Sequence, residues 1–199
     1  SLLADHMIGD PISDHDGVTC CPAIKMESDE KYIVKIISIP TSQNQLEALL
    51  LTGAYPNKEA AMAYFKELTE STAQEALLLQ KLSKLEGFLP YEGWELAPAP
   101  NSDGYRLYLL GTYKPTLARY LKRNPMTHLA AINLGLDLCA ALSVCRRMGY
   151  LYVDLKPENI FLSGDREYRI GDLGFVALDS LKYASLPNRY LSVYTAPEI

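Results

Sequence analysis

An aspartate, a lysine and an asparagine lie close together in the second half of the chain. Asp154 is followed by Lys156 and Asn159 in the segment VDLKPENIFL. A carboxylate can accept the proton of an attacking hydroxyl, an ammonium can neutralise charge on a moving phosphoryl group, and an amide oxygen can ligate a hard divalent ion. The spacing therefore indicates phosphoryl transfer, although a lone Asp-x-x-x-x-Asn is more often a solvated acidic turn.

A carboxylate on a glycine-flanked turn follows downstream of this segment. Asp172 lies between Gly171 and Gly174, directly after the strand-like run YRI. In phosphate-handling sites Mg²⁺ is typically held by one or two carboxylates together with phosphate oxygens. Asp172 and Asn159 are therefore candidate ligands of a magnesium ion.

Three motifs follow one another along the chain: DLKPEN at 154–159, DLG at 172–174 and APE at 196–198. In order and spacing they resemble the signature of the eukaryotic-like (Hanks-type) serine/threonine protein kinases. The resemblance covers nearly the whole chain, and a bacterial member of the family is expected. It implies a two-lobe α+β fold, ATP and Mg²⁺ as cofactors, and a protein substrate.

The resemblance also gives a role to each polar residue of these motifs. It makes Asp154 the catalytic base and Lys156 the group that stabilises the γ-phosphate. It makes Asn159 and Asp172 the ligands of Mg²⁺.

A lysine and a glutamate in the first half complete the implied nucleotide site. Lys35 ends the strand-like run YIVK, and the resemblance places it at the α- and β-phosphates. Its expected helical partner is Glu75, which has apolar residues at +3, +4 and +7; Glu67 and Glu70 fit this pattern less well. The alternative for Glu75 is an exposed helical acid. Because Lys35 and Glu75 lie 40 positions apart, more than the family usually has, residues 42–56 are interpreted as an inserted helix and a candidate partner surface.

The segment YRLYLLGTYKPTL resembles the strand and hinge that hold adenine in the family. By this alignment Leu110 is the gatekeeper residue. Backbone groups of Gly111 and Tyr113 are then expected to face the adenine ring.

Several positions depart from the family pattern. In place of a GxGxxG loop the chain has GDPISDHDG at 9–17, whose few glycines and three aspartates suit a phosphate poorly. Ile33 replaces the alanine that packs on adenine. Val153 replaces the arginine that binds an activation-loop phosphate, so regulation by such a phosphate is not expected. Leu191 replaces a threonine of the substrate loop.

The chain ends one residue after the APE motif, whereas the family continues with further helices. Glu198 would then lack its usual arginine partner, and the helix expected at 127–148 would expose apolar surface. We therefore expect a fragment whose large lobe is completed by missing C-terminal helices or by an additional chain.

Two functional classes fit this pattern. An ATP- and Mg²⁺-dependent serine/threonine protein kinase is favoured, because all six polar positions occur together. The alternative is a pseudokinase, a nucleotide-binding or scaffolding module without catalysis, which the altered glycine loop and Ile33 favour. A small-molecule phosphotransferase is disfavoured by the sequences KPE and APE within the motifs.

The order of elements that must position these residues is α+β. Short apolar runs separated by turn residues predict a three-strand antiparallel meander at 8–40. The helix at 127–148 is apolar almost all round and is expected to be a buried core helix. The other expected elements are helices within 42–85 broken at Pro56, strands at 87–97 and 105–110, and a helix at 116–122. We divide the chain into a candidate cloning remnant at 1–7, a small lobe at 8–111 and an incomplete large lobe at 112–199.

The composition is that of an ordinary soluble globular protein. The chain has 199 residues, of which 48% are hydrophobic and 22% charged, and its formal net charge is −5. Without clustered Lys and Arg, nucleic-acid binding is not expected. The apolar stretch 129–144 is shorter than the roughly 20 residues of a membrane span, so none is expected. The four cysteines lack CxxC spacing, so free thiols are expected. No targeting signal is visible, which favours a cytoplasmic location. The expected partners are a protein substrate or a regulatory protein.

Overall fold

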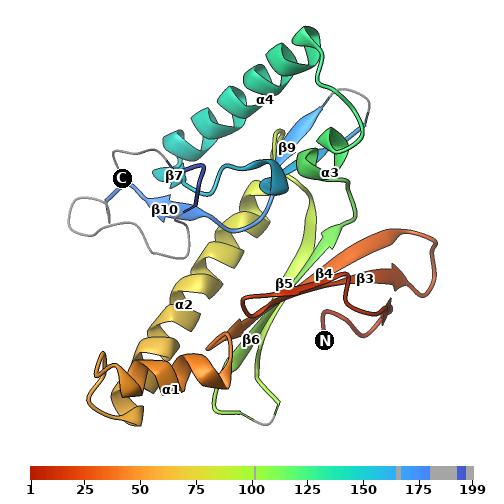
Figure 1. Cartoon of the computed structure of the whole chain (residues 1–199). Helices are drawn as coiled ribbons and strands as arrows, with labels where there is room; N and C mark the ends of the chain where they lie inside the picture. Colours follow the sequence, from red (N-terminus) through yellow and green to blue (C-terminus); the bar gives the residue numbers. More distant parts are fainter. Residues whose placement is uncertain (101, 165–166, 180–191, 196–199) are drawn as a thin grey trace. The chain divides into compact units, whose positions relative to one another are not determined.

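The computed structural model describes the chain except for residues 101, 165–166, 180–191 and 196–199. Two compact units make up the chain. The first comprises residues 1–80 and 90–113, and the second comprises residues 81–89 and 114–199. Figure 1 labels most of the elements of both units. Leu191 and the APE motif lie outside the described residues.

The first unit is built on an antiparallel sheet with the strand order β1-β3-β4-β6-β5, in which the short strand β2 pairs with β3. Strand β4 is rich in β-branched residues, which suit a pleated surface packed on both faces. Together with the helices, the sheet confirms the predicted α+β fold, with one strand more than the predicted meander. The strands are β1 (His6–Ile8), β2 (Ser13–His15), β3 (Val18–Lys25), β4 (Lys31–Ile39), β5 (Tyr91–Pro98) and β6 (Tyr105–Thr112).

Side chains that alternate along the strands form a separate apolar cluster on each face of the sheet. One face carries buried Ala23, Tyr32, Val34 and Leu110, against which Leu2 and Leu3 of the N-terminal segment pack. On the other face Ile39 joins residues of two helices in a second cluster, which Ile37 also contacts.

Two helices, α1 (Gln43–Leu51) and α2 (Lys58–Leu82), occupy the segment between β4 and β5. The predicted break at Pro56 is confirmed. Ser42 caps α1 by accepting a hydrogen bond from the Gln45 amide. Asn57 caps α2 in the same way, because its Oδ1 accepts a hydrogen bond of 2.8 Å from the Ala60 amide.

A histidine in β1 has both ring nitrogens buried without a hydrogen-bond partner among the described residues. The ring of His6 lies edge-on to Tyr32, with the ring centroids 5.1 Å apart. A buried polar group without a partner costs free energy, because it has lost its hydrogen bonds to water. His6 is therefore a local source of instability in the first unit.

We expect His6→Phe to raise the free energy of unfolding by about 1 kcal/mol. Phenylalanine keeps the aromatic contact with Tyr32 and removes the two buried polar atoms. Urea unfolding measures the change, and His15→Phe at an exposed strand position is the control, expected to lie within about 0.5 kcal/mol of the wild type. A loss of stability in His6→Phe would show that the ring nitrogens are satisfied.

The second unit combines two helices with short strand pairs. Strand β7 pairs with β10, and β8 pairs with β9, both antiparallel. Thr116 and Thr127 cap the two helices through their hydroxyl oxygens, as expected for helix N-termini. The elements are α3 (Leu117–Leu121), α4 (His128–Arg147), β7 (Tyr150–Tyr152), the 3₁₀ turn η1 (Pro157–Asn159), β8 (Ile160–Leu162), β9 (Tyr168–Ile170) and β10 (Phe175–Ala177).

The strand predicted at 87–97 begins later than expected, at Tyr91. The residues before it pair with β9 instead: the Leu89 amide donates to the Ile170 carbonyl at 2.8 Å, and the Ile170 amide donates to the Gly87 carbonyl at 2.9 Å. Phe88 and Leu89 are buried there. The apolar run at 87–97 therefore divides between the two units, which its hydrophobicity alone does not reveal.

Helix α4 is not the buried core helix that its composition predicted, but it does expose the apolar surface that we also expected for a large lobe without further helices. Only Ala141 and Cys145 are buried, whereas Leu129, Ile132 and Leu136 are 58–65% exposed. These three side chains share one face at helical spacing. With 20 residues, α4 is also the one helix in the described part of the chain long and apolar enough to cross a membrane, a test that core helices of soluble proteins also pass.

Candidate functional site

The loop between β7 and η1 brings together three of the residues expected to carry the chemistry. The ammonium of Lys156 lies 3.0 Å from Oδ2 of Asp154. The amide nitrogen of Asn159 donates to the same Oδ2 and to the Asp154 backbone carbonyl, each at 2.9 Å. The aspartate is thus held by two neighbouring donors, which fix its carboxylate relative to the loop.

The second carboxylate oxygen of Asp154 is buried and has no hydrogen-bond partner among the described residues. The Asp154 side chain is only 11% exposed. A buried acceptor without a donor is costly and uncommon in folded proteins. Oδ1 of Asp154 is therefore an acceptor whose capacity is unused within the described part of the chain.

The turn with the second acidic residue packs directly against this loop. The Gly171 amide donates to the Asn159 carbonyl at 3.0 Å, and the Tyr152 hydroxyl donates to the Gly171 carbonyl at 2.8 Å. Asp172 has a φ of +76°, a left-handed conformation that is uncommon for residues other than glycine. Its Oδ1 accepts a hydrogen bond of 2.8 Å from the Leu173 amide, which stabilises the turn.

These contacts allow a test of whether the residues suit a divalent ion. Because the amide nitrogen of Asn159 donates to Asp154, its amide oxygen is not engaged by that carboxylate. Asp172 adds a carboxylate on the turn that packs against Asn159. One carboxylate and one amide oxygen suit Mg²⁺ bound to nucleotide phosphates, which completes its coordination with phosphate and water oxygens. The two residues therefore fit the predicted ion.

Gly174, which the sequence placed in the DLG motif without a role of its own, shapes the same loop. A Cβ at Gly174 would lie 2.9 Å from Cβ of Asp154 and 2.9 Å from the Tyr152 ring. The Gly174 carbonyl accepts a hydrogen bond of 2.8 Å from the Val153 amide. Absence of a side chain at 174 therefore permits the close approach that holds the backbone next to Asp154.

In the first unit, Lys35 and Glu75 lie on surfaces that pack together. Lys35 is two residues before Ile37 on the same face of β4, and Glu75 is two helical turns after Leu68 on the same face of α2. Ile37 and Leu68 both pack against the second apolar cluster. Glu75 is buried, with an exposed fraction of 8%.

Burial separates Glu75 from the two alternative glutamates of α2. Glu67 and Glu70 are both exposed. A charged residue is rarely buried without a compensating interaction, so a buried glutamate needs a structural or functional reason. Burial thus favours Glu75 over the alternatives, and its role stays a prediction.

The register of β4 and β6 changes the expected gatekeeper. Leu109, not Leu110, lies opposite Lys35, whereas Leu110 lies opposite Val34 and is buried in the cluster on the other face. Directly paired residues share one face of a sheet. Leu109 therefore shares the face of Lys35, Leu110 does not, and the gatekeeper role stays a prediction.

The two expected hinge residues, Gly111 and Tyr113, have different surroundings in the first unit. Gly111 pairs with Ile33 within the sheet, and a Cβ there would lie 3.0 Å from the Tyr91 ring. The Tyr113 amide donates a hydrogen bond of 3.0 Å to the Lys31 carbonyl. The amide of Tyr113 is thus already engaged in the first unit, which makes it a poor donor to an adenine ring.

The segment at the expected phosphate loop forms a tight hairpin. His15 pairs with Val18 across a two-residue turn, in which Asp16 and Gly17 have φ values of 50° and 75°. Positive φ at both central residues is typical of a type I′ turn. Asp14 and Asp16 are exposed near the turn, so negative charge is displayed there.

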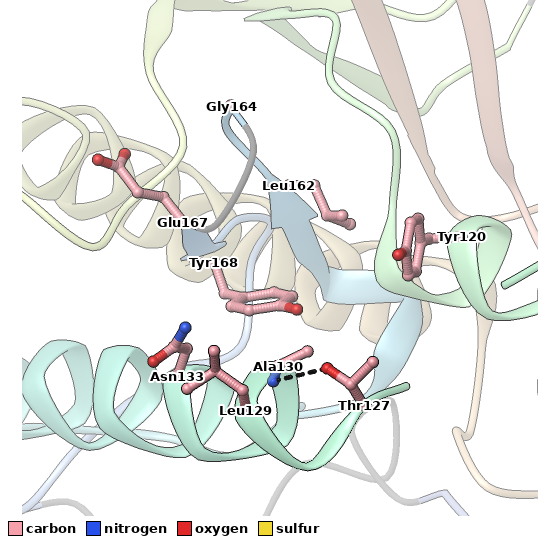
Figure 2. A pocket seen from close by; sticks show the side chains of 9 residues that line it. All are labelled: Tyr120, Thr127, Leu129, Ala130, Asn133, Leu162, Gly164, Glu167 and Tyr168. Carbon is pink, nitrogen blue, oxygen red and sulfur yellow. Dashed lines mark hydrogen bonds between the residues drawn. The ribbon is translucent and has the colours of Figure 1, made fainter. Parts of the chain in front are cut away.

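A cavity of about 400 Å³ in the second unit lies among residues of α3, α4 and the β8–β9 hairpin (Figure 2). The bond drawn in Figure 2 is the cap of α4, in which the Ala130 amide donates to the Thr127 hydroxyl at 3.2 Å. None of the residues predicted to bind nucleotide or metal lines this cavity. Its lining residues are Tyr120, Thr127, Leu129, Ala130, Asn133, Leu162, Gly164, Glu167 and Tyr168.

The cysteines of α4 differ in their predicted reactivity. Burial raises the pKa of Cys145 to about 11, whereas Cys139 is exposed. A raised pKa lowers the fraction of reactive thiolate at neutral pH. At pH 8 we expect iodoacetamide to modify Cys139 of the folded protein and to leave Cys145 unmodified, as measured by peptide mass spectrometry. In urea both should react, and modification of Cys145 at the rate of Cys139 in the folded state would contradict the prediction.

Comparison with known proteins identifies relatives of this chain. The family model described as "Protein kinase domain" matches residues 20–199. The chain is 28% identical over 172 residues to "Probable serine/threonine-protein kinase KCC4" of Saccharomyces cerevisiae, covering 83% of this chain and 14% of that protein. It is 30% identical over 129 residues to "Serine/threonine-protein kinase GIN4" of the same yeast, covering 63% of this chain and 11% of that protein.

A plant protein extends the comparison. The chain is 36% identical over 83 residues to "CBL-interacting protein kinase 4" of Oryza sativa subsp. japonica, covering 39% of this chain and 18% of that protein. The chain thus spans less than a fifth of the length of each of these three relatives. Both organisms are eukaryotes, so these matches give no support to the expected bacterial source.

Proposed function

The chain belongs to the protein kinase family, and on this basis we propose that it transfers the γ-phosphoryl group of ATP, with Mg²⁺, to a serine or threonine hydroxyl of a protein. The names of the yeast relatives support the choice of serine and threonine. Lys156, two residues after Asp154, supports the same choice through the family resemblance.

The observation that carries the proposal is the buried Oδ1 of Asp154, which has no donor among the described residues. In the proposed reaction this oxygen accepts the proton of the substrate hydroxyl, whose oxygen forms a bond to the γ-phosphorus as the bond to the β-phosphate oxygen breaks. Lys156 neutralises charge on the transferred group. Asn159 orients Asp154 through its two hydrogen bonds.

The nucleotide and metal roles follow from the remaining residues. Asn159 and Asp172 would hold Mg²⁺, which neutralises charge on the phosphates when bound. In the first unit Lys35, supported by Glu75, binds the phosphates. Leu109 and the backbone near Gly111 contact the adenine ring. The buried position of Glu75 and the strand register support these assignments.

A pseudokinase remains the second candidate, because two features of the first unit oppose nucleotide binding. The hairpin at the expected phosphate loop is closed by a type I′ turn and displays aspartates. The Tyr113 amide is already bonded to Lys31. In this case the chain acts as a scaffold, and its phosphotransfer residues are structural.

The proposal is tested by measuring binding and turnover on one preparation. We expect ATP with Mg²⁺ to raise the melting temperature, because a ligand that binds only the folded state stabilises it. Incubation with labelled ATP and a generic protein substrate should then give phosphoserine or phosphothreonine, identified by mass spectrometry. A thermal shift without transfer would overturn the proposed catalysis and favour the pseudokinase. Absence of both the shift and the transfer would also overturn nucleotide binding.

The setting of this activity is also proposed. The relatives are much longer proteins than this chain, which covers 14% and 11% of the two yeast proteins. We propose a cytoplasmic kinase domain that acts on protein substrates. The exposed apolar face of α4, formed by Leu129, Ile132 and Leu136, supports further chain or a partner packing there.

A further inference from the structure

Helix α1 and Thr41, which precedes it, contact two elements of the first unit that the proposed function uses. One is the hairpin of β2 and β3, which occupies the place of the phosphate loop. The other is α2, which carries Glu75. The first contact is made by Thr41, just before the helix, and the second by Leu46 in its first turn, so the start of α1 can transmit a displacement from one element to the other.

The tip of the hairpin lies against the start of the α1 segment. A Cβ at Gly17 would be 2.5 Å from Cβ of Thr41 and 2.6 Å from its Cα. The Ser38 amide donates to the Gly17 carbonyl at 2.8 Å. The hairpin tip is thus in contact with the residues that lead from β4 into α1.

Gln45 holds Thr41 in this position. Its side-chain Oε1 accepts hydrogen bonds from the Thr41 amide at 2.8 Å and from the Thr41 hydroxyl at 3.1 Å. The Gln45 amide in turn donates to the Ser42 hydroxyl at 3.2 Å. This reciprocal arrangement resembles a capping box, in which the side chain reaches back to the residues before the helix.

The contact of α1 with α2 is apolar. Leu46 is 4% exposed and packs with Ile39, Ala61 and Phe65, so α1 is fixed against both β4 and the first half of α2. The helix ends in a Schellman motif, with the Ala54 amide bonded to the Leu49 carbonyl at 3.1 Å. Both ends of α1 are therefore well defined.

We propose that α1 is a clamp that couples the β2–β3 hairpin to α2, with Gln45 and Leu46 as its positioning residues. Gln45 acts through Thr41 on the hairpin, and Leu46 acts through Phe65 on the helix that carries Glu75. The contacts of the clamp do not involve a nucleotide. Only its expected effect on the KM for ATP rests on the proposed function. It holds α2 and the hairpin in a fixed relation in the absence of substrate.

Hydrogen exchange tests the coupling directly. Leu46→Ala should increase amide exchange by about tenfold in residues 58–72 of α2 and also in residues 13–18 of the hairpin, which Leu46 does not contact. Leu51→Ala is the matched control, because the same side chain is 88% exposed on the same helix, and both regions should exchange as in the wild type. Unchanged exchange in the hairpin of Leu46→Ala would overturn the clamp.

A milder pair of variants tests Gln45 without disturbing the apolar core. Gln45→Ala removes the acceptor for Thr41 and should raise hairpin exchange and the KM for ATP about fivefold, with kcat changed less than twofold. Gln45→Glu keeps an acceptor oxygen and should restore both values. Failure of glutamate to restore the hairpin would show that Gln45 acts only through helix stability and would overturn its positioning role.

The two proposals fail in different ways. If the wild-type protein binds no ATP, the proposed function is wrong, while the exchange experiments on Leu46→Ala and Gln45→Ala still decide the clamp. If ATP is turned over but amide exchange in the hairpin is the same in both variants as in the wild type, the clamp is wrong and the proposed function stands.

Discussion

Asp154→Asn is expected to lower phosphoryl transfer by about 10²- to 10⁴-fold, the usual contribution of a general base. Asparagine has nearly the shape of aspartate and keeps an oxygen that can accept the hydrogen bond from Asn159, which reaches Asp154 at 2.9 Å. It cannot accept the substrate proton as a carboxylate does. The loss should therefore appear in kcat, while the melting temperature and the thermal shift with ATP remain close to those of the wild type.

Glu158→Gln provides the matched control for this substitution. Glu158 lies in the same loop, is exposed, and undergoes the same chemical change from carboxylate to amide. Its activity should stay within about twofold of the wild type, as expected for a surface substitution away from the reacting groups. Equal activity of Asp154→Asn and Glu158→Gln would exclude Asp154 as the base.

The geometry around Asp154 could be predicted because it is local. Asp154, Lys156 and Asn159 lie within one short loop, and their contacts at 2.9 to 3.0 Å follow from that proximity. The positions of α1 and α2 could also be predicted, since Pro56 and Asn57 end one helical pattern and begin the next.

The gatekeeper could not be predicted in the same way. Leu109 and Leu110 are adjacent and chemically identical, and only the pairing of β6 with β4 decides which of them shares a face with Lys35. A shift of one residue moves every side chain to the other face of a sheet. Register depends on contacts between strands that are distant in sequence, so residue types alone do not reveal it.

Helix α4 shows a second limit of sequence reasoning. Its apolar composition predicted burial, but Leu129, Ile132 and Leu136 are exposed because burial depends on what packs against a helix. The hydrophobicity of a helix face indicates that the face tends to be buried. It does not identify the element that packs against it. The same limit applies to Gly174: the sequence placed it in the DLG motif, but its close approach to Asp154 is not visible in any local pattern.

The features that favour catalysis and those that oppose it lie in different units. The second unit contains the Asp154 loop, in which each contact is suited to phosphoryl transfer. The first unit contains the closed hairpin and the engaged Tyr113 amide. Weak nucleotide binding combined with an intact transfer loop would give a high KM for ATP with an ordinary kcat, because binding and chemistry depend on different residues.

Gly174→Ala is expected to lower the free energy of unfolding by about 2 to 5 kcal/mol, because backbone strain and overpacking act together. Gly174 has a φ of +144°, where residues with a side chain are strained. The added methyl group would also lie 2.9 Å from Asp154 Cβ and from the Tyr152 ring, so one of these must move. Displacement of Asp154 by about 1 Å should cost phosphoryl transfer about 10²-fold.

Gly149→Ala separates the two causes. Gly149 also has a positive φ, +84°, but a Cβ there would meet nothing within 4 Å. The substitution should therefore cost only the conformational term, about 1 to 2 kcal/mol, and leave transfer nearly unchanged. Urea unfolding and initial rates, measured on both variants, provide the comparison. If Gly174→Ala loses no more stability and no more activity than Gly149→Ala, the loop can relax around the methyl group, and close packing of Gly174 on Asp154 is not needed to hold the carboxylate in place.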